Sequence, residues 1–194
     1  FQPTVGADDE ASLKRAFGYL ADVIDVNMGI QNAPQFLGRG LSHGAISDLH
    51  RQHANFCVIK GESSATDIAR LHDACGETLA IFNGRGGLEL PDVLRAGCVG
   101  MIPAPECCDV QVKIYEAMQR GDEALAEALY AQVLPLIIFV MQSIEASLTY
   151  GKRITARRLG LGEVYDRTPS LAPTQFGLDC ATARAAQLPL FPKG

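Results

Sequence analysis

Short apolar runs and amphipathic stretches alternate through the first half of the chain. Four runs lack the strict alternation of a half-exposed strand and are typical of strands buried on both faces, at residues 26–30, 56–59, 79–82 and 99–102. The stretches between and before them have helical spacing with start or stop signals, at residues 8–24, 42–53, 66–74 and 88–96. This repeating βα unit predicts an α/β fold, either a doubly wound sheet or a closed (β/α) barrel.

The pattern changes after residue 102. We predict a helix over 106–120, then a break at Gly121, then one long amphipathic helix from Asp122 to about Tyr150. Beyond it, the pattern predicts a basic helical segment, a loop containing proline and a last helix, at residues 151–158, 166–173 and 178–188. The predicted organisation is a βα region at 1–105 followed by an all-helical region at 106–194.

Composition and charge exclude several classes of protein. The 194 residues are 47% hydrophobic and 20% charged, which excludes a disordered chain. A net charge of −5, from 17 basic and 22 acidic residues, lacks the basic footprint of a nucleic-acid binder. The longest apolar run, 133–141, falls short of the ~20 residues of a membrane span, and the first residues carry no signal-peptide pattern. We expect a cytoplasmic protein without a nucleic-acid or membrane partner.

Cysteines and histidines do not have the spacing of a metal or redox site. The six cysteines contain no C-x-x-C pair and several lie in apolar runs, so we expect reduced thiols that pack as small hydrophobes. The four histidines fall on predicted outer helices, and a catalytic zinc needs three protein ligands. We therefore expect no metal. These residues are Cys57, Cys75, Cys98, Cys107, Cys108 and Cys180, with His43, His50, His53 and His72.

Lys60 directly follows four apolar residues of a predicted buried strand. Desolvation disfavours a charged ammonium, and a neutral amine can attack a carbonyl group. In a (β/α) barrel, residues at the carboxyl ends of strands face the active site. Lys60 is therefore a candidate Schiff-base nucleophile, and the alternative is a strand-end lysine that extends into solvent.

Several motifs around Lys60 agree in order and spacing with one family. Those at the first three strands are Q-N-A-P at 31–34, F-C-V-I-K-G-E-S-S at 56–64 and F-N-G-R-G-G at 82–87. They are followed by A-G-C-V-G-M-I at 96–102 and G-D-E-A-L-A at 121–126. Through residue 150, the chain resembles the dihydrodipicolinate synthase / N-acetylneuraminate lyase family, whose lysine string is close to G-I-K-E-S-S-G-D.

The resemblance implies a (β/α)₈ TIM barrel, which takes about 250 residues. This chain corresponds to its C-terminal half, about four βα units, plus a C-terminal helical extension. We expect Phe1-Gln2-Pro3 to end the fourth strand, with the first half of the barrel and its carboxylate-binding Thr-Thr/Ser motif upstream. The resemblance also implies a homo-oligomer, a dimer of dimers.

The family's lysine condenses with a 2-oxo acid to form an imine, and needs no metal or organic cofactor. At the family's proton-relaying tyrosine this chain has Gln31, and at the arginine of the synthase branch it has Phe36. Both differences argue against the lysine-biosynthesis reaction. Glu62 is the alternative proton carrier, since positions i and i+2 of an extended segment face the same side. Four residues on the next two strands are candidates to bind the substrate. Asn83 and Arg85 could bind hydroxyl groups or a distal carboxylate, and the other two are Gly84 and Ile102.

Three functions follow from this resemblance. The main hypothesis is a sugar-acid dehydratase or aldolase of the 2-keto-3-deoxy type, because the chain resembles the 2-keto-3-deoxy-L-arabonate dehydratase branch, which combines a glutamine with Lys-x-Glu. The alternatives are a 4-hydroxy-tetrahydrodipicolinate synthase and a non-catalytic relative that binds a keto acid. Roles outside the site also stay open at three positions. Gln31 and Glu62 could be ordinary polar loop residues, and Arg85 could contact solvent or a neighbouring subunit.

Overall fold

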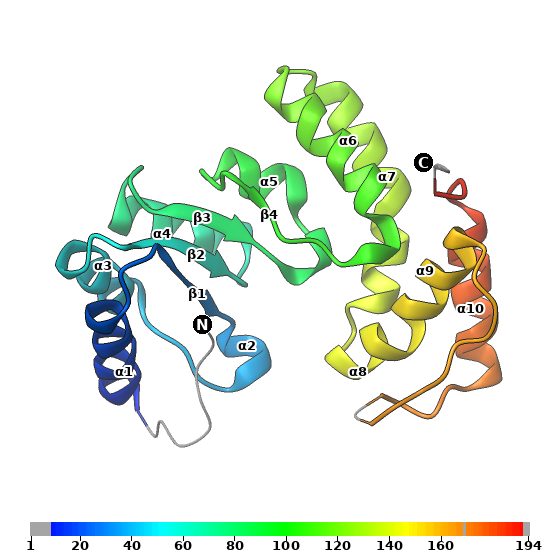
Figure 1. The fold of residues 1–194 in the computed structure, drawn as a ribbon. Coiled ribbons are helices and arrows are strands. Elements are labelled where there is room, and N and C mark those ends of the chain that lie inside the picture. Colours follow the sequence, from blue (N-terminus) through cyan, green and yellow to red (C-terminus); the bar gives the residue numbers. More distant parts are fainter. Residues whose placement is uncertain (1–8, 169, 192–194) are drawn as a thin grey trace. The chain divides into compact units, whose positions relative to one another are not determined.

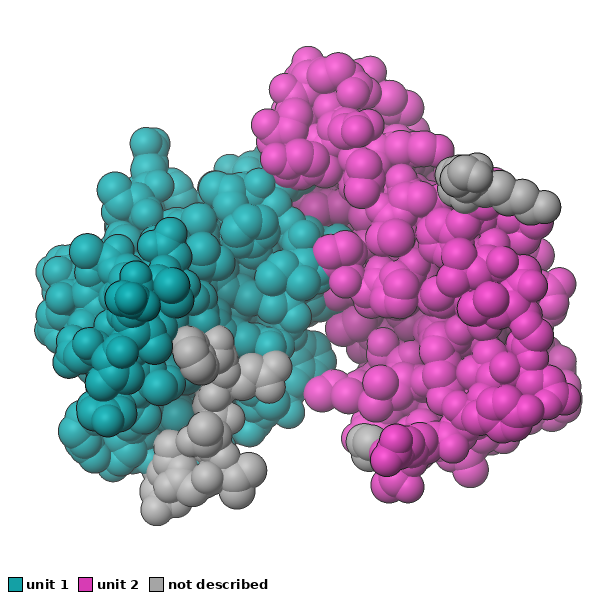
Figure 2. Space-filling view, in the orientation of Figure 1, with its two compact units in different colours: residues 1–85, 92–102 teal, residues 86–91, 103–194 magenta. Residues whose placement is uncertain are grey.

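The computed structural model describes residues 9–168 and 170–191, which form two compact units. The first unit contains the chain up to Arg85 together with Asp92–Ile102, and the second contains Gly86–Pro91 and the chain from Pro103 onward. Figure 2 colours the two units separately. Phe1-Gln2-Pro3 lie outside the described residues. The division at residues 105 and 106 remains a prediction about folding units.

A parallel four-stranded sheet forms the first unit, with strand order β1-β2-β3-β4 (Figure 1). The expected α/β fold is confirmed. Each predicted apolar run overlaps a strand, because a strand buried on both faces needs apolar residues at successive positions. The strands are β1 (Met28–Asn32), β2 (Phe56–Gly61), β3 (Ala80–Asn83) and β4 (Gly100–Met101).

Helices connect the strands, and polar caps define where the principal ones begin. Asp9, Ser42 and Ser64 each accept a hydrogen bond from the backbone N–H three residues later, which satisfies a donor left over in the first turn. Figure 1 shows α1, α3 and α4 on one face of the sheet. The helices are α1 (Glu10–Val23), α2 (Pro34–Leu37), α3 (His43–Gln52), α4 (Ala65–Cys75) and α5 (Leu90–Arg95).

The predicted start of the first strand at residue 26 is wrong by two positions. Val26 is 62% exposed, and the ladder begins at Met28, which pairs with Phe56. The strand instead continues through Gln31 and Asn32, which pair with Lys60 and Gly61. Polar residues extend β1 because backbone pairing with β2 continues to the carboxyl edge whatever their side chains are.

The second unit is all-helical in its described residues. Two short 3₁₀ segments, η1 (Arg85–Gly87) and η2 (Pro105–Cys107), lie where the chain passes between units. Gly86 has a φ of 62°, and an added Cβ there would lie 2.8 Å from Cγ of Met141, so close packing requires a glycine. The remaining elements are α6 (Cys108–Gln119), α7 (Glu123–Val140), α8 (Ile144–Ala146), η3 (a π-helix, Ser147–Gly151), α9 (Lys152–Leu159) and α10 (Gln175–Ala186).

The prediction of a single helix from Asp122 to Tyr150 is wrong. Helix α7 ends at Val140, and Ser143 then starts a new helix by accepting a hydrogen bond from Ala146 N at 3.1 Å. From there the helical chain runs without a break through η3 into α9, so Gly151 does not end it. Periodicity missed the break because a serine cap is a local signal inside an otherwise apolar stretch.

Helix α7 is strongly apolar. Its 18 residues have a mean hydropathy of 1.6, and 28% of them are buried, so by length and composition it passes the test for a membrane span. One such helix among the described residues is weak support, because core helices of soluble proteins pass the same test. At 1.5 Å per residue its length is about 27 Å, slightly below the ~30 Å hydrocarbon core of a bilayer.

Candidate functional site

The register of the first three strands places Gln31, Lys60 and Phe82 side by side near the carboxyl edge of the sheet. Their common face is opposite to α4, because the next residue of β2, Gly61, faces that helix. A Cβ on Gly61 would lie 3.0 Å from Ile68. Alternation along a strand therefore turns Lys60 away from the outer helices.

Lys60, Glu62 and Gln31 form one polar cluster. The Lys60 ammonium makes an ion pair with Oε1 of Glu62, and Nε2 of Gln31 donates a hydrogen bond to the same oxygen at 3.0 Å. The side chains of Lys60 and Glu62 are 23% and 9% exposed, so the carboxylate is almost withdrawn from solvent. The cluster joins an amine that could become a nucleophile to a carboxylate able to take its proton.

Asn32 is a supporting residue, which the sequence placed in the Q-N-A-P motif without a role. Its carbonyl accepts a hydrogen bond from Glu62 N at 2.9 Å, which continues the β1–β2 ladder past the end of β2. Its side chain is fixed in turn by two hydrogen bonds with the backbone of Leu41, at 2.8 and 3.0 Å. An amide residue just beyond a predicted strand was the one sequence feature that could have indicated this role. Its partners lie too far along the chain to be inferred from spacing.

Gly84 lies against the amine and the carboxylate. A Cβ at this position would lie 2.8 Å from Cε of Lys60 and 2.7 Å from Oε1 of Glu62, closer than real Cβ atoms approach such groups. The absent side chain leaves the space in which the two groups meet. The structure thus gives Gly84 a steric role beside the cluster.

Asn83 faces away from the side of the sheet that carries Lys60, although the sequence made it a substrate-binding candidate. It pairs in register with Gly61, whose side faces α4, and only 1% of the residue is exposed. Its Nδ2 donates hydrogen bonds to the carbonyls of Gly61 and Ser63, at 2.8 and 3.2 Å. The amide is therefore committed to the backbone that leads to and from Glu62.

Arg85 and Ile102 are the two remaining candidate site residues from the sequence. Arg85 has a φ of 54° and begins η1, where the chain turns out of the sheet. Ile102 is 46% exposed, donates its N–H to the Asn83 carbonyl at 2.9 Å, and by alternation from Gly100 shares the face of Lys60. An apolar side chain with this orientation suits contact with the carbon chain of a ligand.

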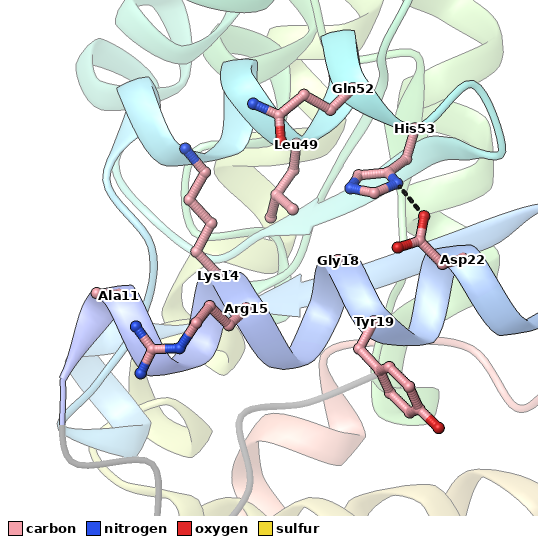
Figure 3. A pocket seen from close by; sticks show the side chains of 9 residues that line it. All are labelled: Ala11, Lys14, Arg15, Gly18, Tyr19, Asp22, Leu49, Gln52 and His53. Atoms are coloured by element: carbon pink, nitrogen blue, oxygen red, sulfur yellow. Dashed lines mark ion pairs between the residues drawn. The ribbon is translucent and has the colours of Figure 1, made fainter.

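The described residues contain no group of three or more histidine, cysteine or acidic side chains able to hold a metal. His50 is tied to the backbone oxygen of Phe56 at 2.7 Å and to Thr78 Oγ1 at 2.8 Å. His53, the residue that follows α3, pairs with Asp22 of α1 at 3.1 Å across an outer groove of about 550 Å³ (Figure 3). That groove contains none of the residues of the lysine cluster.

The cysteines are unpaired, and two of them lie in the core. Burial raises the pKa of the Cys98 thiol to about 12. Burial, with the nearby negative charge of Glu106, also raises the pKa of Cys107. Neutral thiols are poor nucleophiles, so these two side chains pack without chemistry of their own.

The model of the dihydrodipicolinate synthetase family matches residues 7–175. The 4-hydroxy-tetrahydrodipicolinate synthase of Methanoculleus marisnigri is 30% identical over 139 residues, which cover 70% of this chain and 47% of that enzyme. This chain thus spans about half the length of that relative.

Solved structures agree on the fold. The dihydrodipicolinate synthase of Rhodopseudomonas palustris aligns with a TM-score of 0.84 and 22% identity, over 96% of this chain and 64% of that one. The enzyme of Thermotoga maritima aligns with a TM-score of 0.83 and 14% identity, over 96% and 65%. A partial barrel of parallel βα units, with the helices that follow it, fits these alignments. The chain belongs to the dihydrodipicolinate synthetase family.

Proposed function

We propose that the protein containing this chain is a lyase that forms a Schiff base between Lys60 and a 2-oxo acid. The observation that carries the proposal is the Lys60 amine at the carboxyl edge of a parallel sheet, in contact with the nearly buried carboxylate of Glu62. Residues at this edge form the active site in (β/α) barrels. Membership of the family supports the same chemistry.

The reaction needs the ammonium to lose a proton before it can attack. Glu62 is in contact with the ammonium and accepts the proton, and Gln31 holds the receiving oxygen by its N–H. The free amine attacks C2 of the 2-oxo acid, and the carbonyl oxygen leaves as water after two proton transfers. The resulting protonated imine withdraws electrons from the neighbouring carbon, so no metal or organic cofactor is required for the step.

Gln31 limits what the cluster can do next. An amide donates and accepts hydrogen bonds but does not take up or release a proton near neutral pH. We therefore assign later proton transfers to Glu62 and give Gln31 an orienting role. Gly84 supplies room beside the imine, and Ile102 lies on the face where the substrate carbon chain would extend.

Two substrate classes remain, each favoured by a different observation. The relatives named 4-hydroxy-tetrahydrodipicolinate synthase favour condensation of pyruvate with aspartate semialdehyde. The hydrogen bond from Gln31 to Glu62 favours dehydration or cleavage of a 2-keto-3-deoxy acid, because Glu62 then replaces the tyrosine as proton carrier. The comparisons support the synthase more strongly than the main hypothesis drawn from the sequence.

Reductive trapping tests the common step. The full-length protein is incubated with pyruvate and borohydride, which delivers hydride to the imine carbon and leaves a stable secondary amine. We expect one reduced pyruvate on Lys60 by peptide mass spectrometry, and none in Lys60→Ala. Lys14→Ala is the matched control, because Lys14 also pairs with an acid, Asp48 at 2.7 Å, but lies on α1. A wild-type protein that is folded and carries no adduct contradicts the proposal and favours a binding protein.

Substrate profiling separates the two classes. Aspartate semialdehyde with pyruvate is compared with 3-deoxy-2-keto sugar acids under the same conditions. Consumption of only the first pair identifies the synthase, and consumption of only the sugar acids identifies the dehydratase or aldolase.

We also propose that the protein acts in the cytoplasm as a dimer of dimers, without nucleic-acid or membrane partners. Sedimentation of the full-length protein tests the assembly. A species of four subunits supports it, and a monomer at micromolar concentration contradicts it.

A further inference from the structure

The side chain of Asn83, at the end of β3, binds the backbone of a neighbouring segment. The residue is 1% exposed, and both of its hydrogen bonds go to backbone carbonyls of the neighbouring strand segment. The carbonyl of Gly61 lies at 2.8 Å from Nδ2 and that of Ser63 at 3.2 Å. Gly61 is the last residue of β2, so the second bond reaches a segment that has already left the regular ladder.

The two carbonyls flank Glu62. On the other side, the Glu62 N–H is held by the Asn32 carbonyl at 2.9 Å. The backbone on both sides of the carboxylate is therefore fixed by one contact from β1 and two from a single amide group on β3. A side chain whose backbone is held in this way loses little further freedom when it meets Lys60.

We propose that Asn83 is a positioning residue that holds the 61–63 backbone so that the Glu62 carboxylate faces the Lys60 amine. The inference rests on the proposed function, because it assumes that Glu62 receives the Lys60 proton. It replaces the substrate-binding role expected from the sequence with an indirect one. An amide is suited to the task, because its two N–H groups can reach two carbonyls at once.

A double-mutant cycle tests whether Asn83 acts through Glu62. The rate of pyruvate trapping on Lys60 is measured in full-length wild type, Asn83→Ala, Glu62→Gln and the double variant. We expect a fall of about 10- to 100-fold in Asn83→Ala, since displacement by about 1 Å can cost that much. In the Glu62→Gln background, the same change should cost less than about twofold, because coupled residues are not additive.

Two further variants separate positioning from general loss of structure. Asn83→Asp keeps the size but loses the N–H donors, so we expect it to be as slow as Asn83→Ala. Asn55→Ala is the matched control, because the Asn55 amide also donates to backbone carbonyls, those of Ala21, Ile24 and Val26, at 2.8, 3.1 and 3.5 Å. It should trap pyruvate at a rate within about twofold of wild type.

The outcomes also separate this inference from the proposed function. Additive losses in the cycle, or a full rate in Asn83→Asp, overturn the positioning role while a wild-type adduct leaves the lyase proposal intact. A crystal structure of the Asn83→Ala protein gives a readout that does not depend on turnover. A Glu62 carboxylate displaced from the Lys60 amine supports the positioning role, whose catalytic consequence still requires the wild-type adduct. A carboxylate still paired with that amine overturns it.

Discussion

Single residues at the carboxyl edge of the sheet form the proposed site. Glu62 accepts from both Lys60 and Gln31, so one carboxylate oxygen links an ammonium group to an amide. The two groups of this ion pair come from the same strand end and need no long-range packing to find each other. What packing adds is the close approach of Gly84, which sets how much room they have.

Gly84→Ala should separate Lys60 from Glu62. The new methyl group would need the space within 2.8 Å of Lys60 Cε, so one of the two side chains must move. We expect the rate of pyruvate trapping to fall at least about 10-fold, because displacing a reacting group by about 1 Å can cost that much. Peptide mass spectrometry of borohydride-treated protein measures it.

The control for this change is Gly44→Ala on α3. The nearest atom to a Cβ at Gly44 is Ser42 Oγ at 3.9 Å, so the methyl group fits there. Alanine is favoured over glycine in a helix by about 1 kcal/mol, so this variant should trap normally and be slightly more stable. Equal trapping in both variants would contradict the steric role of Gly84.

At the level of helices, the basic segment at 151–158 has a different role from the one its sequence suggests. Its residues are typical of a solvated face or a subunit contact, but Arg158 is 1% exposed. It makes a bidentate ion pair with Asp109, at 2.7 and 2.8 Å, and donates to the carbonyls of Glu106 and Pro189. The guanidinium therefore joins α9, α6 and the C-terminal segment of the second unit.

Arg158→Ala should strongly destabilise the second unit. Removing one partner leaves the Asp109 carboxylate partly buried without its counter-charge, which typically costs about 3–5 kcal/mol. Denaturant unfolding followed by circular dichroism measures the loss. Arg157→Ala is the control, because Arg157 is the exposed neighbour on the same helix and should change stability by less than about 0.5 kcal/mol.

The Asp109 pair also predicts how the second unit responds to acid. Burial raises the pKa of Asp109, but the hydrogen bonds and charge of Arg158 outweigh burial and hold that pKa below its ordinary value of 3.8. A depressed pKa means that the stabilisation is complete above pH 4 and is lost as the pH falls through the folded-state value. Asp109→Asn should therefore flatten the acid side of the stability profile.

Glu106 affects the pH dependence of stability in the opposite direction from Asp109, because its pKa is raised. Burial raises the pKa of this carboxyl, which lies against Gly151 with all three carboxyl atoms 3.5 Å from the position of an added Cβ. The folded state then favours the neutral acid, so stability falls as the pH rises above 4.5 toward the folded-state value. Glu106→Gln should raise the denaturation midpoint at pH 8 and leave it unchanged at pH 4.

For the whole molecule, the two compact units each contain a core thiol that can report unfolding. Cys98 belongs to the first unit and Cys107 to the second, and both are buried. Labelling by a thiol reagent should therefore require opening of the unit that contains the thiol. Quantitative mass spectrometry at increasing denaturant should give one labelling curve for each unit. Rapid labelling of either cysteine in native buffer would contradict its burial.

The fold was largely predictable from the chain because its signals are local. A strand buried on both faces needs successive apolar residues, and a helix needs apolar residues every three or four positions. Those rules located all four strands to within about two residues and most helices of the first unit. They failed where one short contact overrode the period, as at the Ser143 cap, and they did not predict the short helix α2.

The candidate site was predictable only in part. Lys60 and Glu62 are two residues apart, so strand alternation alone places them on one side. Asn83 and Gly84 are adjacent in sequence but have unrelated tasks, one fixing the backbone of β2 and the other making room beside Lys60. Strand alternation places the two residues on opposite faces, but it does not say which of them meets Lys60, because that depends on which atoms of β2 lie opposite.

The sequence alone determined the α/β class, the family and the lysine at a strand end, since these follow from patterns a few residues long. Only the tertiary structure decided which side chains meet: Gln31 on Glu62, Asn83 on the backbone around it, and Arg158 on Asp109. The partners in these contacts are separated by about 20 to 50 residues. At the sheet, a shift of one position in strand register would turn Gln31 or Asn83 to the other face. Local sequence preferences determine where helices and strands form, and the packing of these elements determines which side chains come into contact.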